Sequence, residues 1–329
     1  MASTIKDKFA HLRIPLEVVV KATNNFHHDN IIGHGVPGTA YRGQLLQSKI
    51  FREITARRFD WKHGEGHLEF LRESTVLLDL EHTNLVSVIG FCDEKDEKII
   101  VTRYEAKGNL GRYLNSPKLT WTQRLRVCVG VARALSYLHD VKGRDYSVIH
   151  CNINSDMILL DENWEAKLCG FEHSIKQVEH NKDEVSPCEH IGTMGCMDPE
   201  IEKTGGVTHK SDTYSFGVIL FEVLCGRRAF IDDHENEANR FLVSLAKYHY
   251  ENKSLQDILN VDLYDRMSPQ SVLKCSKLAY SCLNEDRARR PNIDDIVNQL
   301  ERAVELQLRY ENIVSSFFFI IIFFLHCHS

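Results

Sequence analysis

Short apolar runs rich in β-branched residues dominate the first third of the chain. Runs of this kind, bounded by glycine and polar residues, are typical of β-strands. They predict strands within residues 31–41, 54–57, 85–92 and 98–104. In front of them, residues 14–26 carry a helix-like apolar run that ends at Asn24 and Asn25. Because asparagine is a poor helix former, this pair favours a helix end.

Apolar residues with helical spacing follow after residue 120. One stripe of side chains three or four positions apart, which predicts a buried helix, consists of Leu125, Val129, Ala132, Leu135 and Leu138. A second apolar helix is expected to open at Lys210 and to run through Leu224. A third is expected after Pro291, because proline suits the first turn of a helix and an apolar stripe follows over residues 293–304.

The tail, residues 309–329, differs from the rest of the chain. Its nine successive apolar residues, 317–325, are fewer than the roughly 17 to 25 residues that a helix needs to cross a bilayer. Three interpretations stay open: a weak membrane-dipping end, a segment that packs on a partner, and an artefact of a truncated or misread gene. An exposed, uncharged run of this composition is also prone to aggregation.

Length and composition set further limits. The 329 residues suffice for one large or two small domains. A net charge of −6 gives no long-range attraction to nucleic acid or to an anionic membrane, so a nucleic-acid partner is not expected. The 10 cysteines include no C-x-x-C pair, which favours reduced thiols over a disulfide framework. Because Ala2 replaces the glycine that myristoylation needs, that anchor is not expected.

The stretch from Val148 to Glu172, VIHCNINSDMILLDENWEAKLCGFE, resembles the catalytic loop and metal-binding turn of protein kinases. In that family the two motifs read H-R-D-x-K-x-x-N and D-F-G. The resemblance assigns the altered positions as follows: Cys151 for the arginine, Asn152 for the catalytic aspartate, Asn154 for the lysine, Asp156 for the metal-binding asparagine, Gly170 for the metal-binding aspartate and Glu172 for the final glycine.

Other kinase motifs lie in the strand-rich first part. Gly33, Gly35 and Gly38 match the glycine-rich loop that covers nucleotide phosphates. Arg57 falls on the phosphate-bridging lysine, with Arg58 as the alternative register. Glu73 matches the helix carboxylate that pairs with this lysine, and Thr102 the gatekeeper of the adenine pocket. A preserved Arg57–Glu73 pair and two solvated charges both remain open.

Structural positions of the family are also matched. The resemblance implies that Leu77, Val88, His150 and Phe171 stack into one spine and that Asp212 ties down the catalytic-loop backbone. It further implies that Glu200 and Arg290 form a buried ion pair, whose breakage typically costs about 3–5 kcal/mol. Thr193 is expected to have a structural role in its turn.

The resemblance extends over residues 14–308 and is closest to plant receptor-like kinases and receptor-like cytoplasmic kinases. It implies an α+β, two-lobed protein kinase-like fold, with a small β-rich lobe and a large helical lobe. The expected divisions are residues 1–30, an N-terminal extension with a helix docked on the small lobe; 31–103, the small lobe; 104–308, the large lobe; and the tail, 309–329.

The altered chemistry predicts a pseudokinase, because an asparagine amide cannot take up a proton near neutral pH and Gly170 offers no metal ligand. A weakly active Ser/Thr kinase remains the alternative, in which Asp156 and Glu172 rebuild a metal site, and a tail-tethered membrane adaptor is the third hypothesis.

ATP remains a candidate ligand, whereas Mg²⁺ binding is expected to be weak or absent. Expected partners are other signalling proteins, such as an active receptor kinase or an immune sensor. The expected location is the cytoplasm or the inner face of the plasma membrane, with membrane contact only indirect or through the tail.

Overall fold

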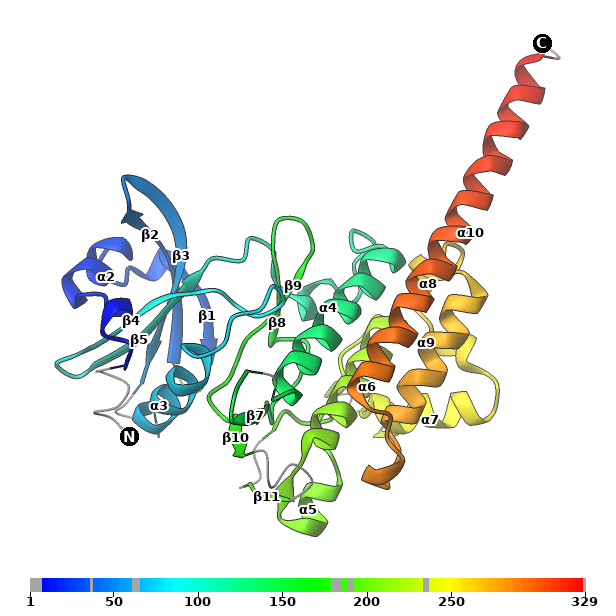
Figure 1. Cartoon of the computed structure of the whole chain (residues 1–329). Helices are drawn as coiled ribbons and strands as arrows, with labels where there is room; N and C mark the ends of the chain where they lie inside the picture. Colours follow the sequence, from blue (N-terminus) through cyan, green and yellow to red (C-terminus); the bar gives the residue numbers. More distant parts are fainter. Residues whose placement is uncertain are drawn as a thin grey trace.

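The computed structural model describes residues 8–35, 38–60, 66–141, 143–178, 185–188, 192–232 and 237–327. These residues form a β-rich small lobe and a helical large lobe (Figure 1). The two-lobed α+β fold that the resemblance implies is therefore confirmed.

The small lobe is built on one five-stranded antiparallel sheet. Its strands lie in the order β1-β2-β3-β5-β4. Their bounds are β1 (Ile31–Gly35), β2 (Gly38–Gln47), β3 (Ile50–Phe59), β4 (Val88–Glu94) and β5 (Glu97–Arg103). Ser48 and Lys49, both with positive φ, form the two-residue turn between β2 and β3, as favoured in tight hairpins. Helix α3 (Gly66–Leu77) packs beside this sheet.

The chain ahead of the sheet lies against the small lobe. It contains the 3₁₀ turns η1 (Ala10–Leu12) and η2 (His28–Asn30) and the helix α2 (Leu16–Ala22). Val19 on α2 is buried in a cluster with Ile54 and Val101 of the sheet. The backbone N–H of Ile14 donates to the carbonyl of Phe91 at 2.8 Å. The small-lobe sheet thus covers most of the apolar side chains of this segment, namely Ile14, Leu16, Val18, Val19 and Ala22.

The large lobe packs around helices α4 (Trp121–His139) and α6 (His209–Cys225). Both begin with a capping box, formed by Thr120 with Gln123 and by Thr208 with Ser211. The apolar stripe predicted on α4 is buried. The other helices are α5 (Glu200–Thr204), α7 (Leu242–Glu251), α8 (Val261–Tyr264), α9 (Pro269–Cys282) and α10 (Ile293–Cys327), with 3₁₀ turns η3 (Leu110–Tyr113), η5 (Glu237–Asn239), η6 (Leu255–Ile258) and η7 (Arg287–Arg289).

Three small sheets shape the segment between α4 and α6. They are β6 (Gly108–Asn109) with β8 (Ile158–Leu160) and β9 (Ala166–Leu168); β7 (Tyr146–Ile149) with β10 (Ile175–Val178); and β11 (Ser186–Pro187) with β12 (Gly206–Val207). The residues corresponding to the catalytic loop, 150–157, connect β7 to β8, and the Gly170–Glu172 turn follows β9. The β7–β10 pair and the β8–β9 hairpin therefore hold the two ends of this stretch.

The tail continues the last helix. Helix α10 begins at Ile293 and extends as far as Cys327, so its final turns project beyond the rest of the large lobe (Figure 1). Ile313 and Val314, just before the most apolar run, are exposed. Within the described residues, no helix combines the length and the apolar character needed to cross a membrane.

Candidate functional site

Asp212 anchors the loop of residues 150–157, as the resemblance implies. Its carboxylate lies on α6 and accepts hydrogen bonds from the backbone N–H groups of His150, at 2.8 Å, and Cys151, at 3.0 Å. The Nε2 atom of His139 lies 3.0 Å from the same carboxylate. Burial opposes ionisation, but the contacts with His139 and with this backbone bring the pKa of Asp212 below its ordinary value. Cys151 is thereby held at a φ of 68°.

The residues of the expected spine belong to one core. His150 and Phe171 are fully buried, and their ring centroids lie 4.7 Å apart. Leu77 and Phe171 are members of the large-lobe core, against which Val88 packs. The Nε2 atom of His150 lies 2.9 Å from the carbonyl oxygen of Cys169. The loop and the Gly170–Glu172 turn are therefore joined, and the frame around the altered residues is intact.

Asn152 and Asn154 form a closed polar network with Thr193. The Nδ2 group of Asn154 donates to the Thr193 hydroxyl at 2.9 Å and to the Asn152 amide oxygen at 3.1 Å. The Thr193 hydroxyl in turn donates to that amide oxygen at 3.0 Å. The base position is thus held by an amide whose oxygen already accepts two hydrogen bonds. The structural role expected of Thr193 agrees with these contacts.

Met157, and not Asp156, occupies the position of the metal-binding asparagine. The motif places that asparagine seven residues after its histidine, and seven residues after His150 is Met157. In the structure a Cβ added to Gly170 would lie 2.3 Å from the Met157 sulfur. The backbone N–H of Cys169 donates to the Met157 carbonyl at 2.9 Å. The assignment of Asp156 to this position was therefore one residue early.

The Gly170–Met157 pair does not fit Mg²⁺. Gly170 has no side chain, and a thioether is a soft ligand, whereas Mg²⁺ requires oxygen ligands. Gly170 has a φ of 83°, so a larger residue there would face both a strained backbone and the Met157 sulfur. The space in which the family holds its metal-binding carboxylate is filled by an apolar side chain.

Asp156 is engaged by an arginine on the large lobe. Its two oxygens accept hydrogen bonds from the Arg228 guanidinium at 2.8 and 2.9 Å, a bidentate arrangement. Arg228 also donates to the Ser155 hydroxyl at 3.0 Å. The Asp156 carboxylate, a candidate metal ligand from the sequence, is thus paired with Arg228 in this structure.

Arg57 carries two buried carboxylates. Its Nη1 atom lies 2.7 Å from Glu73 and 3.2 Å from Glu172, whose side chains are 4% and 1% exposed. The pair with Glu73 is therefore formed. Arg58 belongs to a different pair, with Glu97 at 2.6 Å, so the register that assigns Arg57 to the lysine position holds.

Glu172, the other candidate metal ligand from the sequence, is paired with Arg57. Its carboxylate lies on Arg57, where burial opposes its ionisation but Arg57 brings its pKa below the ordinary value. Burial, only partly offset by Arg57, raises the pKa of Glu73 to about 7. The guanidinium at the phosphate-bridging position thus already has two carboxyl partners, which occupy it where the family binds phosphate.

The glycines of the loop over the nucleotide position lie in the β1–β2 hairpin. Gly33 pairs with Ala40, and Gly35 with Gly38. At Gly33 and Gly35 an added Cβ would meet nothing within 4 Å, whereas at Gly38 it would lie 2.0 Å from the Arg58 carbonyl. Gly38 is therefore required by the β2–β3 pairing itself. Thr102 lies on β5 opposite Thr55, as the gatekeeper assignment requires of a strand residue.

The expected Glu200–Arg290 ion pair is not present. Arg290 instead binds Asp198 at 2.8 Å, and both side chains are 0% exposed. Arg287 adds a second contact to Asp198 at 2.9 Å. Glu200 pairs with Lys203 at 2.7 Å near the surface. Asp198 lies just before α5, and its carboxylate points toward Arg290 and Arg287. Glu200 begins the helix, and its side chain points toward Lys203 in the same helix.

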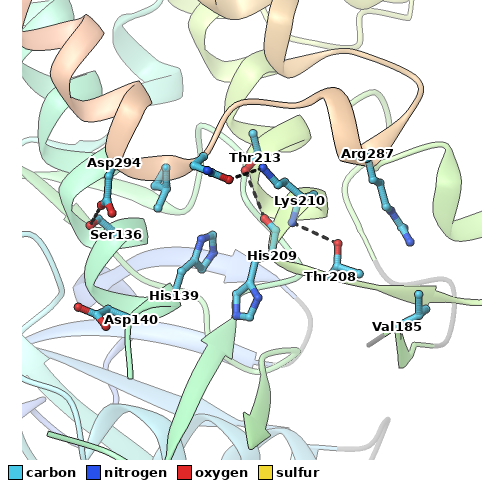
Figure 2. Close-up of a pocket in the computed structure, with 13 residues that line it drawn as sticks. Ser136, His139, Asp140, Val185, Thr208, His209, Lys210, Thr213, Arg287 and Asp294 are labelled. Carbon is cyan, nitrogen blue, oxygen red and sulfur yellow. Dashed lines mark hydrogen bonds between the residues drawn. The ribbon is translucent and has the colours of Figure 1, made fainter. Parts of the chain in front are cut away.

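A separate cavity lies behind the anchor of the loop. It has a volume of about 740 Å³ and lies between the end of α4, the start of α6 and the segment leading into α10 (Figure 2). Ser136 and Asp294 are hydrogen-bonded at 2.6 Å across one side of it. His139 and His209 line it with ring centroids 4.6 Å apart. Its described lining includes no residue from 150–172, so this cavity is distinct from the kinase-like site.

The altered site offers no alternative cluster of metal ligands. A metal ion can be shared by three His, Cys, Asp or Glu side chains whose donor atoms lie close together. In the described part of the chain, one such group is found, and it consists of His27, His28 and Asp29. All three are exposed and lie in the turn before β1.

Comparisons with known proteins give matches along most of the chain. The family model for the protein tyrosine and serine/threonine kinase domain matches residues 26–300. The chain is 37% identical over 304 residues to receptor-like protein kinase HERK 1 of Arabidopsis thaliana, covering 91% of this chain and 35% of the relative. It is 35% identical over 301 residues to receptor-like protein kinase ANXUR2 of the same plant, covering 90% of this chain and 34% of the relative. The chain thus spans about a third of the length of these curated relatives.

Proposed function

Because the chain belongs to the protein tyrosine and serine/threonine kinase family, we propose that it is a pseudokinase that acts as a scaffold or allosteric partner of another signalling protein. The observation that carries this proposal is the pair at the two metal-ligand positions, Gly170 and Met157, which offers no oxygen side chain. The partner proposed is an active receptor kinase or an immune sensor, and the site of action is the cytoplasm or the inner face of the plasma membrane.

The chemistry supports this proposal at each step that phosphoryl transfer needs. That reaction relies on a base or orienting group, a cation on the transferred phosphate, and metal ions. Asn152 cannot accept the proton, Asn154 carries no charge, and Gly170 cannot bind metal. Loss of a single preorganised electrostatic group typically lowers the rate about 10²- to 10³-fold. Although such losses are not additive, three together leave no ordinary activity.

The first test is phosphoryl transfer by the purified full chain. With Mg²⁺ and ATP labelled on the γ-phosphate, we expect neither self-labelling nor labelling of a generic protein substrate above the background without protein. Should labelling appear, Arg57→Ala separates intrinsic activity from a contaminating kinase. Labelling that Arg57→Ala abolishes contradicts the pseudokinase proposal.

The second candidate function is a weakly active Ser/Thr kinase with a non-standard metal site. The preserved Arg57–Glu73 pair and the glycine-rich hairpin favour it. Its mechanism requires Asp156 and Glu172 as ligands, yet these carboxylates pair with Arg228 and Arg57. Any labelling in this mechanism has to disappear in Asp156→Ala and in Glu172→Gly. Labelling that is unchanged in both variants excludes it.

Nucleotide binding is proposed as optional and independent of Mg²⁺. We expect ATP to change the melting temperature of the full chain by the same amount in Mg²⁺ as in EDTA, because no carboxylate is available to link metal and phosphate. For a ligand that binds only the native state at 100-fold saturation, the stabilisation is about 2.7 kcal/mol. Glu172→Gly is the informative variant, since it releases one side of Arg57 and should enlarge the ATP-dependent shift. A shift in the wild-type chain that requires Mg²⁺ contradicts the lost metal site.

A further inference from the structure

The thiols of Cys151 and Cys188 meet between two segments that are far apart in the sequence. Cys151 belongs to the loop between β7 and β8, and Cys188 follows β11. The Cys188 side chain interacts with the Cys151 thiol, which also donates to the Ile149 carbonyl at 3.5 Å. Both are half-buried and pack against the apolar cluster of Ile149, Ile201 and Val207. The contact is therefore partly shielded from water.

The backbone on each side of this contact is fixed. The N–H of Cys151 donates to the buried carboxylate of Asp212 at 3.0 Å. The N–H of Cys188 donates to the Gly205 carbonyl at 3.2 Å, and the preceding residues pair with β12. Two thiols held next to each other in this way have lost most of the freedom that forming a bond between them would remove. The bond to be formed is a sulfur–sulfur bond of about 2.05 Å.

We propose that Cys151 and Cys188 are a redox modification site, at which a peroxide converts the two thiols into a reversible disulfide that joins the loop of residues 150–157 to the segment preceding α5. The cross-link closes a ring of roughly 38 residues. This inference concerns the two cysteines alone and holds whether or not the chain transfers phosphate.

The chemistry balances with hydrogen peroxide as the oxidant. The Cys188 thiol loses its proton, its thiolate attacks one peroxide oxygen, and the O–O bond breaks. The hydroxide that leaves takes up this proton, so that a sulfenic acid and one water result. The Cys151 sulfur then attacks the Cys188 sulfur, the S–S bond forms, and the sulfenic oxygen leaves as a second water. Two thiols thus give two electrons to one peroxide. The hydrogen bond with Cys188, together with burial, raises the pKa of Cys151 well above its ordinary value, which assigns the first attack to Cys188.

Peptide mapping of the full chain tests this directly. The protein is treated with hydrogen peroxide, blocked with an alkylating agent and digested with trypsin without reductant. The expected product links residues 145–167, which contain Cys151, to residues 183–203, which contain Cys188 and Cys196. Fragmentation distinguishes the latter two cysteines. Dithiothreitol should release the linked peptides.

The thermal consequence gives a second readout. Because the cross-link restricts the unfolded chain, the oxidised protein should melt roughly 5–10 °C above the reduced protein. Cys151→Ser and Cys188→Ser should each abolish both the linked peptide and the shift, whereas Cys169→Ser, which removes another half-buried thiol, should retain both. Three results would overturn the proposal: a link from Cys151 to a cysteine other than Cys188, oxidation of Cys188 to sulfinic acid without a link, and an unchanged melting temperature of the linked protein. The mapping of wild-type protein decides the case even if a serine variant fails to fold.

Discussion

Replacing Asp198 with alanine is expected to lower the free energy of unfolding by about 3–5 kcal/mol. The substitution leaves Arg290 charged and 0% exposed, and it removes the second contact to Arg287. It also deprives the N–H of Glu200 of the Asp198 oxygen that accepts its hydrogen bond at 3.0 Å. Burial opposes the ionisation of Asp198, but Arg290 and Arg287 bring its pKa below the ordinary value, so the pair is charged at neutral pH. Chemical denaturation at pH 7 measures the loss.

Glu200→Ala is the matched control, two residues away. Its partner Lys203 has a side chain that is 63% exposed, so removing this surface pair should lower the free energy of unfolding far less than Asp198→Ala does. The double variant Asp198→Ala with Arg290→Met should recover part of the loss, because it removes the unpaired buried charge together with its partner. If Glu200→Ala is the more damaging single substitution, the pairing described for Arg290 is wrong and the pairing expected from the family pattern is right.

The sequence predicted the fold and its fixed frame well, because these depend on many positions at once. The strand runs, the stripe on α4 and the long helices follow directly from apolar periodicity. Asp212 and the His150–Phe171 contact followed from their motifs. The choice between Arg57 and Arg58 was settled only by geometry, since on β3 neighbouring side chains point to opposite faces.

Single-residue assignments within the site were less predictable. Placing Asp156 at the metal-binding position relied on a carboxylate that suits a cation, and the structure puts Met157 there instead. Nothing near Asp156 in the sequence indicates Arg228, which reaches it from a distant segment. The same holds for Glu172, whose partner Arg57 is 115 positions away. Side-chain pairing across the fold decides these cases, and a local motif does not contain that information.

The altered residues have acquired internal partners in place of ligands. Asn152 and Asn154 bind Thr193, Glu172 binds Arg57, and Met157 fills the space beside Gly170. Each contact satisfies a polar group or fills a volume that the lost chemistry would otherwise leave open. A scaffold needs hydrogen-bond partners for its buried polar groups, because a buried polar group without a partner lowers the free energy of unfolding by about 1–3 kcal/mol. This agrees with a site maintained for its shape, which makes Arg57 the residue to test.

Arg57→Met is expected to destabilise the small lobe by about 3–5 kcal/mol at pH 8, because it leaves the buried carboxylates of Glu73 and Glu172 side by side without their cation. Arg58→Met is the neighbouring control. Its pair with Glu97 has side chains that are 40% and 22% exposed, so the expected loss is about 0–1 kcal/mol. Adding Glu73→Gln and Glu172→Gln to Arg57→Met should restore most of the stability, since the charges that repel each other are then gone.

The loss in Arg57→Met should also depend on pH. Without Arg57, burial and mutual repulsion raise the pKa of both carboxyl groups in the folded protein, whereas in the unfolded chain each titrates at about 4.3. The folded state then binds more protons between these values, so stability falls as pH rises from about 5 to 8 and recovers as pH is lowered. Of these two carboxyl groups, only Glu73 has a raised pKa in the wild-type chain, about 7, because Arg57 holds the pKa of Glu172 low against burial. The contribution of the pair to the pH dependence of stability should therefore be weaker in the wild-type chain than in Arg57→Met. Denaturation curves of both proteins from pH 5 to pH 8 measure the difference, and equal slopes would show that Arg57 does not hold the two carboxylates in their charged forms.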